Sequence, residues 1–252
     1  MVDADMGQTD DITATEPPAV RTEPNPKWIR GRIGATTVVD SRATRFVWEF
    51  PYYPQWYVPR GDVTGELRTS DRTSTADGLG TGTHLDLVLA DGTVIEDAAK
   101  SWDHPELAGL VRFRWDALDR WFEEEVEVFV HPRSPYTRVD VLPSTRHVVV
   151  RVDGVIVAES RRASILYETG LPPRYYLPPE DVRTELLTPT TTSTGCPYKG
   201  VARYWSVTVE GTIHDDLVWG YDEPLPESAD VAGLLCFYNE RVELTVDGSP
   251  AS

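Results

Sequence analysis

The residues of this sequence best suited to chemistry are a cysteine and a lysine in one short stretch, Cys196-Pro197-Tyr198-Lys199-Gly200. Proline presets a turn and glycine permits a positive φ, so a tight loop is expected to hold the thiol and the ammonium near one another. A nearby ammonium lowers the pKa of a thiol and favours the nucleophilic thiolate. Cys196 is therefore the candidate nucleophile and Lys199 its electrostatic activator. The structural alternative is that Cys196 is small buried filler while Lys199 reaches solvent.

Aromatic side chains are dense around this stretch, and an aromatic pocket beside a lysine can hold a planar or anionic small molecule. The alternative is that most of them, including Tyr175 and Tyr204, form the core and the cross-strand pairs of a β-sheet. The candidate ligand-binding residues are Tyr176, Arg183, Glu185, Cys196, Tyr198, Lys199, Trp205, Trp219 and Tyr221.

Acid–base and metal-binding candidates are less specific. A general base could come from His214 or from a carboxylate, but no spacing selects one residue. His214 precedes two aspartates in a metal-ligand-like run, yet it has no second histidine nearby in the sequence, so no metal site is predicted. The carboxylates considered are Glu168, Asp181, Glu185, Asp215 and Asp216. A turn-capping role for Asp181 and cross-sheet pairing for Arg183 or Glu185 are the structural alternatives.

An internal repeat organises the elements that must position these residues. Tyr176-Leu177-Pro178, Asp181-Val182 and Glu185-Leu186 recur 119 residues earlier as Tyr57-Val58-Pro59, Asp62-Val63 and Glu66-Leu67. Roughly one position in three is identical along the ungapped alignment of residues 29–75 with 148–194, which indicates a tandem duplication. At this spacing Ala76-Asp77-Gly78-Leu79-Gly80 stands where the second copy has Gly195-Cys196-Pro197-Tyr198-Lys199. The loss of the loop in the first copy predicts that only the second copy carries a site.

Each copy begins with signals for short strands. Residues 29–39 form a hairpin with its turn near Gly34-Ala35, and 147–158 form another about Asp153-Gly154, since Asp-Gly between β-branched runs is a strong hairpin signal. Residues 45–50 and 165–169 are expected to be strands. In residues 113–122, apolar side chains at helical spacing predict a short amphipathic helix. The predicted fold is all-β, with two copies of a small meander or open barrel and one short helix late in the first copy.

The predicted organisation has four parts. Residues 1–26 are polar and acidic and are expected to be a disordered tail. Residues 27–130 are the first repeat, degenerate and structural, and 131–145, which include three prolines, are a docked linker. Residues 146–252 are the second repeat, with the candidate functional site.

Composition excludes several classes of function. A net charge of -17 argues against nucleic acid as a partner, because phosphate binding requires clustered Lys and Arg. No apolar run approaches the length of a membrane span, and no signal peptide is evident at the N-terminus, so a cytoplasmic protein is expected. Two cysteines, Cys196 and Cys236, are too few for a disulfide framework or a cysteine-based zinc site, although a single bridge between them is left open.

The motifs together resemble a known family. Tyr176-x-Pro178, Asp181-Val182-Arg183-x-Glu185, Thr194-x-Cys196-Pro197-x-Lys199-Gly200 and Trp219-x-Tyr221 are similar to the bacterial domain-of-unknown-function-427 family, and the His131–Tyr136 connection is similar to its two-copy actinobacterial members. The resemblance implies a compact β-fold of the Mss4-like or β-tent kind. Relatives of that architecture hold zinc through paired C-x-x-C motifs, which this sequence lacks, so neither metal nor cofactor is carried over. The family has also been labelled nucleotidyltransferase-like, but the paired carboxylates and phosphate loop of such enzymes are missing.

The leading functional hypothesis is a small-molecule-binding module, whose second copy holds an unidentified ligand beside the Cys196–Gly200 loop. The rival is a thiol-dependent enzyme with Cys196 as nucleophile, Lys199 as activator, and His214 or a carboxylate as base. Weaker alternatives are an adaptor protein and a nucleotidyltransferase. The sequence does not define the ligand or the oligomeric state.

Overall fold

The computed structural model describes residues 20–251, and the first of the four predicted parts lies largely outside this range. The fold is almost entirely β, as predicted, with only short 3-10 turns between strands. Neither half closes into a barrel. Within residues 20–251 there is no helix of the length and apolar character that a membrane crossing requires.

From residue 20 onward, the first half contains eleven strands and three 3-10 turns. These are β1 (Thr22–Pro24), β2 (Ile29–Ile33), β3 (Thr36–Ser41), β4 (Arg45–Val47), β5 (Gln55–Pro59), η1 (Arg60–Asp62), β6 (Glu66–Ala76), β7 (Gly80–Val88), β8 (Val94–Trp102), η2 (Pro105–Leu107), β9 (Leu110–Phe113), η3 (Trp115–Ala117), β10 (Arg120–Glu123) and β11 (Val126–Val128) within the described residues.

The second half repeats this order with small changes. Its described elements are β12 (Val139–Pro143), β13 (Val148–Val152), β14 (Val155–Ser160), β15 (Ser164–Glu168), β16 (Arg174–Leu177), η4 (Pro179–Asp181), η5 (Thr184–Leu186), β17 (Leu187–Cys196), β18 (Gly200–Val209), β19 (Thr212–Tyr221), η6 (Pro226–Val231), β20 (Leu235–Phe237), η7 (Asn239–Arg241), β21 (Glu243–Val246) and β22 (Ser249–Pro250).

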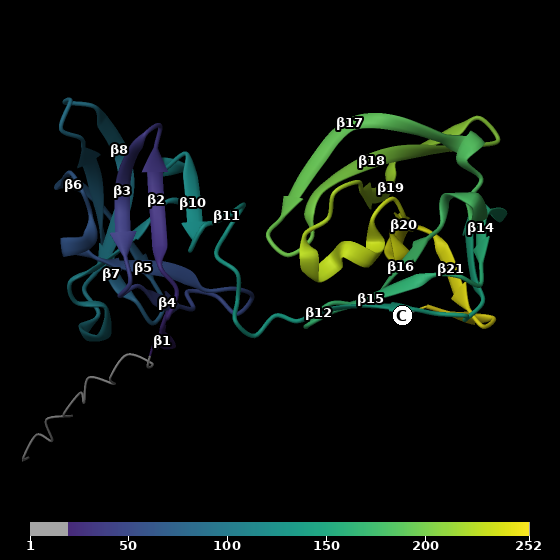
Figure 1. Ribbon diagram of the computed structural model, residues 1–252, viewed down its shortest axis with the longest axis horizontal. Helices are drawn as coiled ribbons and strands as arrows, with labels where there is room; N and C mark the ends of the chain where they lie inside the picture. Colours follow the sequence, from purple (N-terminus) through teal and green to yellow (C-terminus); the bar gives the residue numbers. More distant parts are fainter. Residues whose placement is uncertain (1–19, 252) are drawn as a thin grey trace, which may run out of the picture. The chain divides into compact units, whose positions relative to one another are not determined.

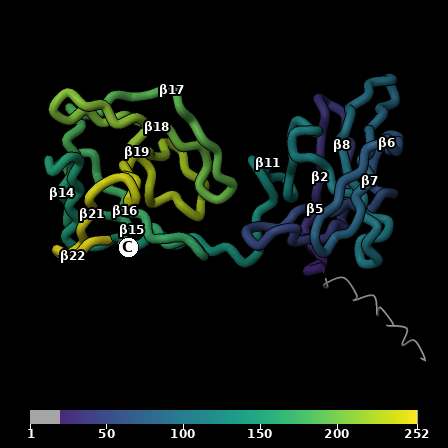
Figure 2. Tube along the Cα trace, turned by 180° about the vertical axis from the view of Figure 1, so that it is seen from behind, coloured from purple at the N-terminus to yellow at the C-terminus, as the bar shows by residue number. Residues whose placement is uncertain are grey.

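The sheet topology confirms the duplication. The larger sheet has the order β1-β4-β5-β9-β8-β7-β6 in the first half and β12-β15-β16-β20-β19-β18-β17 in the second. The smaller sheets have the orders β11-β10-β2-β3 and β14-β13-β21-β22, which match when one is read backwards. The long strands β17, β18 and β19 are drawn in green to yellow in Figure 1, and β6, β7 and β8 are labelled in Figure 2.

The predicted hairpins are present. Strands β2 and β3 pair around Gly34-Ala35, and β13 and β14 pair around Asp153-Gly154. Asp153 and Gly154 both have positive φ, 50° and 78°, as the two-residue turns that match strand twist require.

Two local predictions differ from the structure. The predicted helix over residues 113–122 is reduced to the 3-10 turn Trp115–Ala117, and the residues on either side of it belong to strands β9 and β10. Tertiary pairing outweighs the helical spacing there, because Phe113 and Trp121 bury their side chains as strand residues. The predicted strand 45–50 ends at Val47, whereas its counterpart β15 extends to Glu168.

The larger sheet of the second half has a buried apolar cluster on each of its faces. Since side chains alternate along a strand, Leu177, Val218 and Phe237 point into a core shared with the smaller sheet, while their neighbours point to the opposite face. On that opposite face, Tyr176, Trp219 and Cys236 join a second apolar cluster with Leu166, Tyr204, Tyr221, Val231 and Ala202. The candidate site lies on this second face.

Strand pairing corrects the alignment of the two copies at the central loop. Ala76 pairs with Gly80 in the first half, and Cys196 pairs with Gly200 in the second, so each hairpin has a three-residue turn between them. The counterpart of Cys196 is therefore Ala76, and that of Lys199 is Leu79, one position away from the ungapped alignment. The additional residue lies before β17, where the second half has the turn η5.

Candidate functional site

A cavity of about 210 Å³ opens on the second face of the larger sheet in the second half. Strands β15, β16, β18 and β19 supply most of its wall, and the β17–β18 turn and the loop after β15 supply the rest. Its lining residues are Leu166, Glu168, Leu171, Pro172, Arg174, Tyr176, Lys199, Tyr204, Trp219 and Tyr221. Four of the predicted ligand-binding residues, Tyr176, Lys199, Trp219 and Tyr221, thus lie around one cavity.

An ion pair forms the polar wall of this cavity. The Lys199 ammonium, at the end of the β17–β18 turn, contacts the Glu168 carboxylate at the end of β15. Their side chains are only 14% and 10% exposed, so the charges are largely withdrawn from water. Withdrawing the two charges from water costs desolvation energy, and the attraction between them offsets that cost only in part. Sequence reasoning noted Glu168 as an acid–base candidate without linking it to Lys199.

The aromatic wall consists of nearly buried rings. Trp219 donates its indole N–H to the Tyr176 hydroxyl at 3.2 Å, and the two rings meet edge to face with centroids 6.3 Å apart. Burial raises the pKa of Tyr176 and of Tyr221 well above the ordinary tyrosine value. Both hydroxyls therefore stay protonated at neutral pH and remain able to donate hydrogen bonds. Their place in the apolar cluster agrees with the alternative that most aromatics are core.

Arg174 is a cavity residue that sequence reasoning missed. Its guanidinium bonds to Glu240 at 2.8 Å and lies 5.6 Å from the Trp219 ring centroid. Position 174 opens the stretch R-Y-Y-L-P, so its alternation with Tyr176 along β16 is the signal that could have placed it on this face. Lys199 and Arg174 are thus both paired with glutamates.

Cys196 and Tyr198 occupy the same hairpin but do not line the cavity. Cys196 ends β17 and is half-buried, whereas Cys236 is fully buried; the two are not bridged. Burial raises the pKa of the Cys236 thiol far above its ordinary value. The Tyr198 hydroxyl accepts a hydrogen bond of 2.6 Å from the backbone N–H of Ser134. The segment after β11 is therefore attached to the hairpin through Tyr198.

The remaining candidates lie away from the cavity. Arg183 and Glu185 form a local surface pair at 2.9 Å, not a cross-sheet pair, and Trp205 packs against the core on the other face. Asp181 accepts bonds of 2.6 Å from the side chains of both Ser160 and Arg162, so it links separate segments and does not have the turn-capping role considered for it.

His214 and its neighbours do not form a metal centre. The His214 ring bonds to Asp153 at 2.8 Å, while the Asp216 carboxylate accepts bonds of 2.6 Å from Thr190 and Thr192. Between residues 20 and 251, no three histidine, cysteine or acidic side chains gather closely enough to hold a metal ion.

The first half has different residues at the positions of Lys199 and its surroundings. Leu79, the counterpart of Lys199, is 4% exposed and packs with Tyr57 and Trp102. Glu49, the counterpart of Glu168, instead accepts a 2.8 Å bond from the Tyr57 hydroxyl and lies 3.3 Å from Arg112. Arg112 pairs with Tyr57 as Cys236 pairs with Tyr176, so it stands at the Cys236 position. The buried glutamate is common to both halves, while its cation comes from different strands.

A family profile matches the chain twice, over residues 21–124 and 140–248, and its description is "Domain of unknown function (DUF427)". The chain belongs to the DUF427 family. The two matched segments coincide with the two sets of sheets, so each half is one DUF427 repeat. A search of curated proteins returned no match.

Within this DUF427 protein the two repeats carry different residues on the same face. His84 lies opposite Lys100 in the first repeat, at the positions where Tyr204 lies opposite Trp219 in the second. The first repeat therefore has two basic residues where the second has two aromatic cavity residues. The resemblance that the sequence motifs indicate is confirmed at the level of family and repeat number.

Proposed function

We propose that this DUF427 protein binds a small planar molecule in the cavity of its second repeat. The observation that carries the proposal is the Lys199–Glu168 pair set into a wall that is rich in aromatic and aliphatic side chains. A fold that needed only packing could place a leucine there, as the first repeat does with Leu79. Burying the charges of Lys199 and Glu168 costs desolvation energy. A ligand that forms hydrogen bonds with both groups would explain why the protein keeps them.

The charges around the cavity favour an uncharged ligand over an anion. Lys199 is compensated by Glu168, and Arg174 by Glu240, so the wall carries little net charge. A carboxylate beside an ammonium instead offers an acceptor and a donor side by side, which suits a ligand with a donor–acceptor edge. The volume of about 210 Å³ lies below the roughly 300–1,000 Å³ of drug-sized sites, so the ligand is small.

The thiol-enzyme alternative has less support. The ammonium expected to activate Cys196 is already paired with the Glu168 carboxylate, and an ammonium neutralised in this way stabilises a neighbouring thiolate less. The cavity is lined by Lys199 but not by Cys196. Nothing in the site favours the adaptor or nucleotidyltransferase alternatives.

The proposal is tested by ligand-observed NMR with a library of uncharged planar heterocycles of one or two rings. We expect fragments whose saturation transfer disappears in the double variant Lys199→Leu/Glu168→Gln, which removes both charges without stranding either. The matched control is Arg203→Leu/Asp222→Asn, which removes an exposed ion pair between β18 and the residue after β19, with its charged atoms 2.7 Å apart and both side chains 56% exposed. Fragments that bind both variants as they bind the wild type, or an absence of binding fragments, would refute the cavity as a binding site.

A further inference from the structure

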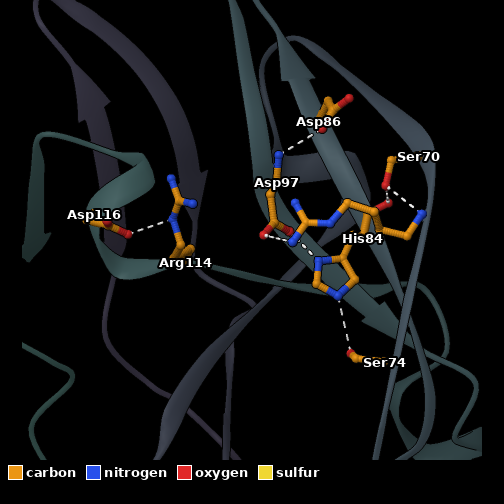
Figure 3. A network of polar contacts seen from close by, with 8 residues as sticks. Ser70, Ser74, His84, Asp86, Asp97, Arg114 and Asp116 are labelled. Carbon is orange, nitrogen blue, oxygen red and sulfur yellow. Dashed lines mark hydrogen bonds and ion pairs between the residues drawn. The ribbon is translucent and has the colours of Figure 1, made fainter.

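The first repeat contains a polar cluster of its own, on the sheet face that corresponds to the cavity face of the second repeat. His84 on β7 is buried, with 11% of its side chain exposed, and its Nδ1 contacts the Asp97 carboxylate on β8. Its Nε2 lies 3.3 Å from the Ser74 hydroxyl on β6. Figure 3 shows the imidazole between the two, with Asp97 at one ring nitrogen and Ser74 at the other.

The scaffold fixes this arrangement. Strand register is shifted between Leu85 and Leu87 opposite Asp97, and Asp97 takes a positive φ of 52°. Its backbone N–H donates to Asp86 at 2.8 Å, and Arg72 lies 3.3 Å from its carboxylate. A bulge of this kind re-aims a side chain, here toward the ring of His84.

The bonds define the protonation pattern. Burial opposes ionisation of Asp97, but the hydrogen bond from His84 and the nearby positive charges outweigh it and lower the pKa of this carboxyl. An ionised carboxylate only accepts, so Nδ1 is the donor to Asp97, and in the neutral imidazole Nε2 is then the acceptor that faces Ser74. A hydroxyl beside a base that a third group orients is the pattern of an activated nucleophile, and such contacts are often longer without substrate.

The second repeat shows that the fold does not require these residues. Pairing places Thr194 and Tyr204 at the positions of Ser74 and His84, and their hydroxyls lie 2.8 Å apart. A tyrosine there satisfies the hydroxyl but supplies no base. The counterpart of Asp97, Asp216, also has a positive φ but bonds to threonines instead. Both repeats have the same strand arrangement here, whereas the contacting serine, histidine and aspartate are found in the first repeat.

A positive charge lies on the same face. His84 pairs with Lys100, and Ser74 with Gly82, so these side chains all project to one side of the sheet. The Lys100 chain crosses over Gly82, where an added Cβ would lie 2.9 Å from its Cδ. Among residues 20–251 no carboxylate forms an ion pair with this ammonium.

We propose that the first repeat is a hydrolase site for small carboxylic esters, with Ser74 as nucleophile and His84 as general base. Ser74 Oγ attacks the ester carbonyl as its proton passes to His84 Nε2, and Lys100 offsets the negative charge that forms on the carbonyl oxygen. Collapse expels the alcohol, which takes the proton from Nε2. Water then attacks the acyl-serine, gives one proton to Nε2, and that proton returns to Ser74 as the acid leaves. Asp97 is a positioning residue that holds the tautomer.

The test is labelling of the full chain with a fluorophosphonate probe, with the modified residue mapped by peptide mass spectrometry. We expect the label on Ser74 and not on Thr194, which serves as an internal control in the same digest. His84→Gln is expected to slow labelling by about 10²–10⁴-fold, the range of general-base catalysis. Ser70→Ala removes a hydroxyl that donates to the His84 carbonyl at 3.2 Å and accepts from the Arg72 backbone N–H at 3.3 Å, and it is expected to leave labelling unchanged.

Ester hydrolysis provides a second measurement, which distinguishes a loss of catalysis from a loss of folding. Wild type is expected to hydrolyse p-nitrophenyl acetate faster than Ser74→Ala, and Asp97→Asn to lower kcat by at least about 10-fold with KM unchanged. Circular dichroism checks that these variants remain folded. No label on Ser74 in folded wild type at millimolar probe, or a label confined to other residues, would overturn the proposal.

Discussion

Replacing Lys199 by leucine tests the energetics of the buried ion pair directly. The variant copies the residue that the first repeat has at this position, so shape and apolar character suit the fold. It leaves the Glu168 carboxylate, only 10% exposed, without its ammonium partner. Removing one member of a buried pair costs about 3–5 kcal/mol, mostly because the remaining charge is stranded. We expect a loss of stability in this range.

The double variant Lys199→Leu/Glu168→Leu separates the pair from the packing. Replacing both members by apolar groups is often close to neutral, so its cost should be below about 2 kcal/mol and far from additive. The exposed pair provides the comparison, because Arg203→Leu should cost no more than about 1 kcal/mol.

Urea unfolding followed by hydrogen exchange on peptides from residues 146–252 reads the stability of the second repeat separately from the first. A loss below about 1 kcal/mol for Lys199→Leu, or a double variant that costs the sum of the two single ones, would show that the pair is solvated and that the reasoning is wrong.

Three further predictions follow from burial and geometry. Iodoacetamide should alkylate only Cys196 in the native protein and Cys236 as well after unfolding, as counted by intact mass; two rapid native modifications would contradict the burial of Cys236. Gly220→Ala should destabilise by roughly 1–3 kcal/mol in thermal melts, since its Cβ would lie 2.6 Å from a backbone carbonyl, whereas Gly61→Ala, with open space around it, should be near neutral. Hydrogen bonds lower the pKa of Asp181, so its stabilisation is full above about pH 4 and is lost as pH falls through the folded pKa. Between about pH 5 and 2, the melting temperature of Asp181→Asn should therefore fall less than that of the wild type. Equal falls would show that ionised Asp181 does not contribute to stability.

Much of the fold was predictable because the relevant signals are local. Asp153-Gly154 between valine runs defines a hairpin from sequence alone, and the repeated Tyr-x-Pro and Asp-Val elements reveal the duplication. The one-residue shift before β17 was hidden, since β6 and β17 are rich in threonine and serine and look alike in either register. The helix over residues 113–122 was predicted wrongly, because helical spacing cannot reveal that neighbouring strands pair with the same residues.

The candidate site was only partly predictable. The loop drew attention to Lys199, and the density of aromatic residues drew attention to Tyr176, Trp219 and Tyr221, which line the cavity. The partner of Lys199 depends on a contact between strands distant in sequence, so Glu168 could not be assigned to it beforehand. Ser74, His84 and Asp97 were missed for the same reason. They come from three separate strands, and only the register and a bulge bring them together.

The differing origin of the cation beside the shared glutamate has a consequence for how the gene can change. Copying the β17–β18 hairpin into the first repeat would bring a second cation beside Glu49, which already has Arg112. Copying the β6–β7 hairpin into the second would leave Glu168 next to Leu79 and Cys236, with no cation from either source. Gene conversion in either direction between the two halves therefore gives a glutamate with either two cations beside it or none. We expect selection to keep the two coding segments diverging and to prevent their return to identical copies.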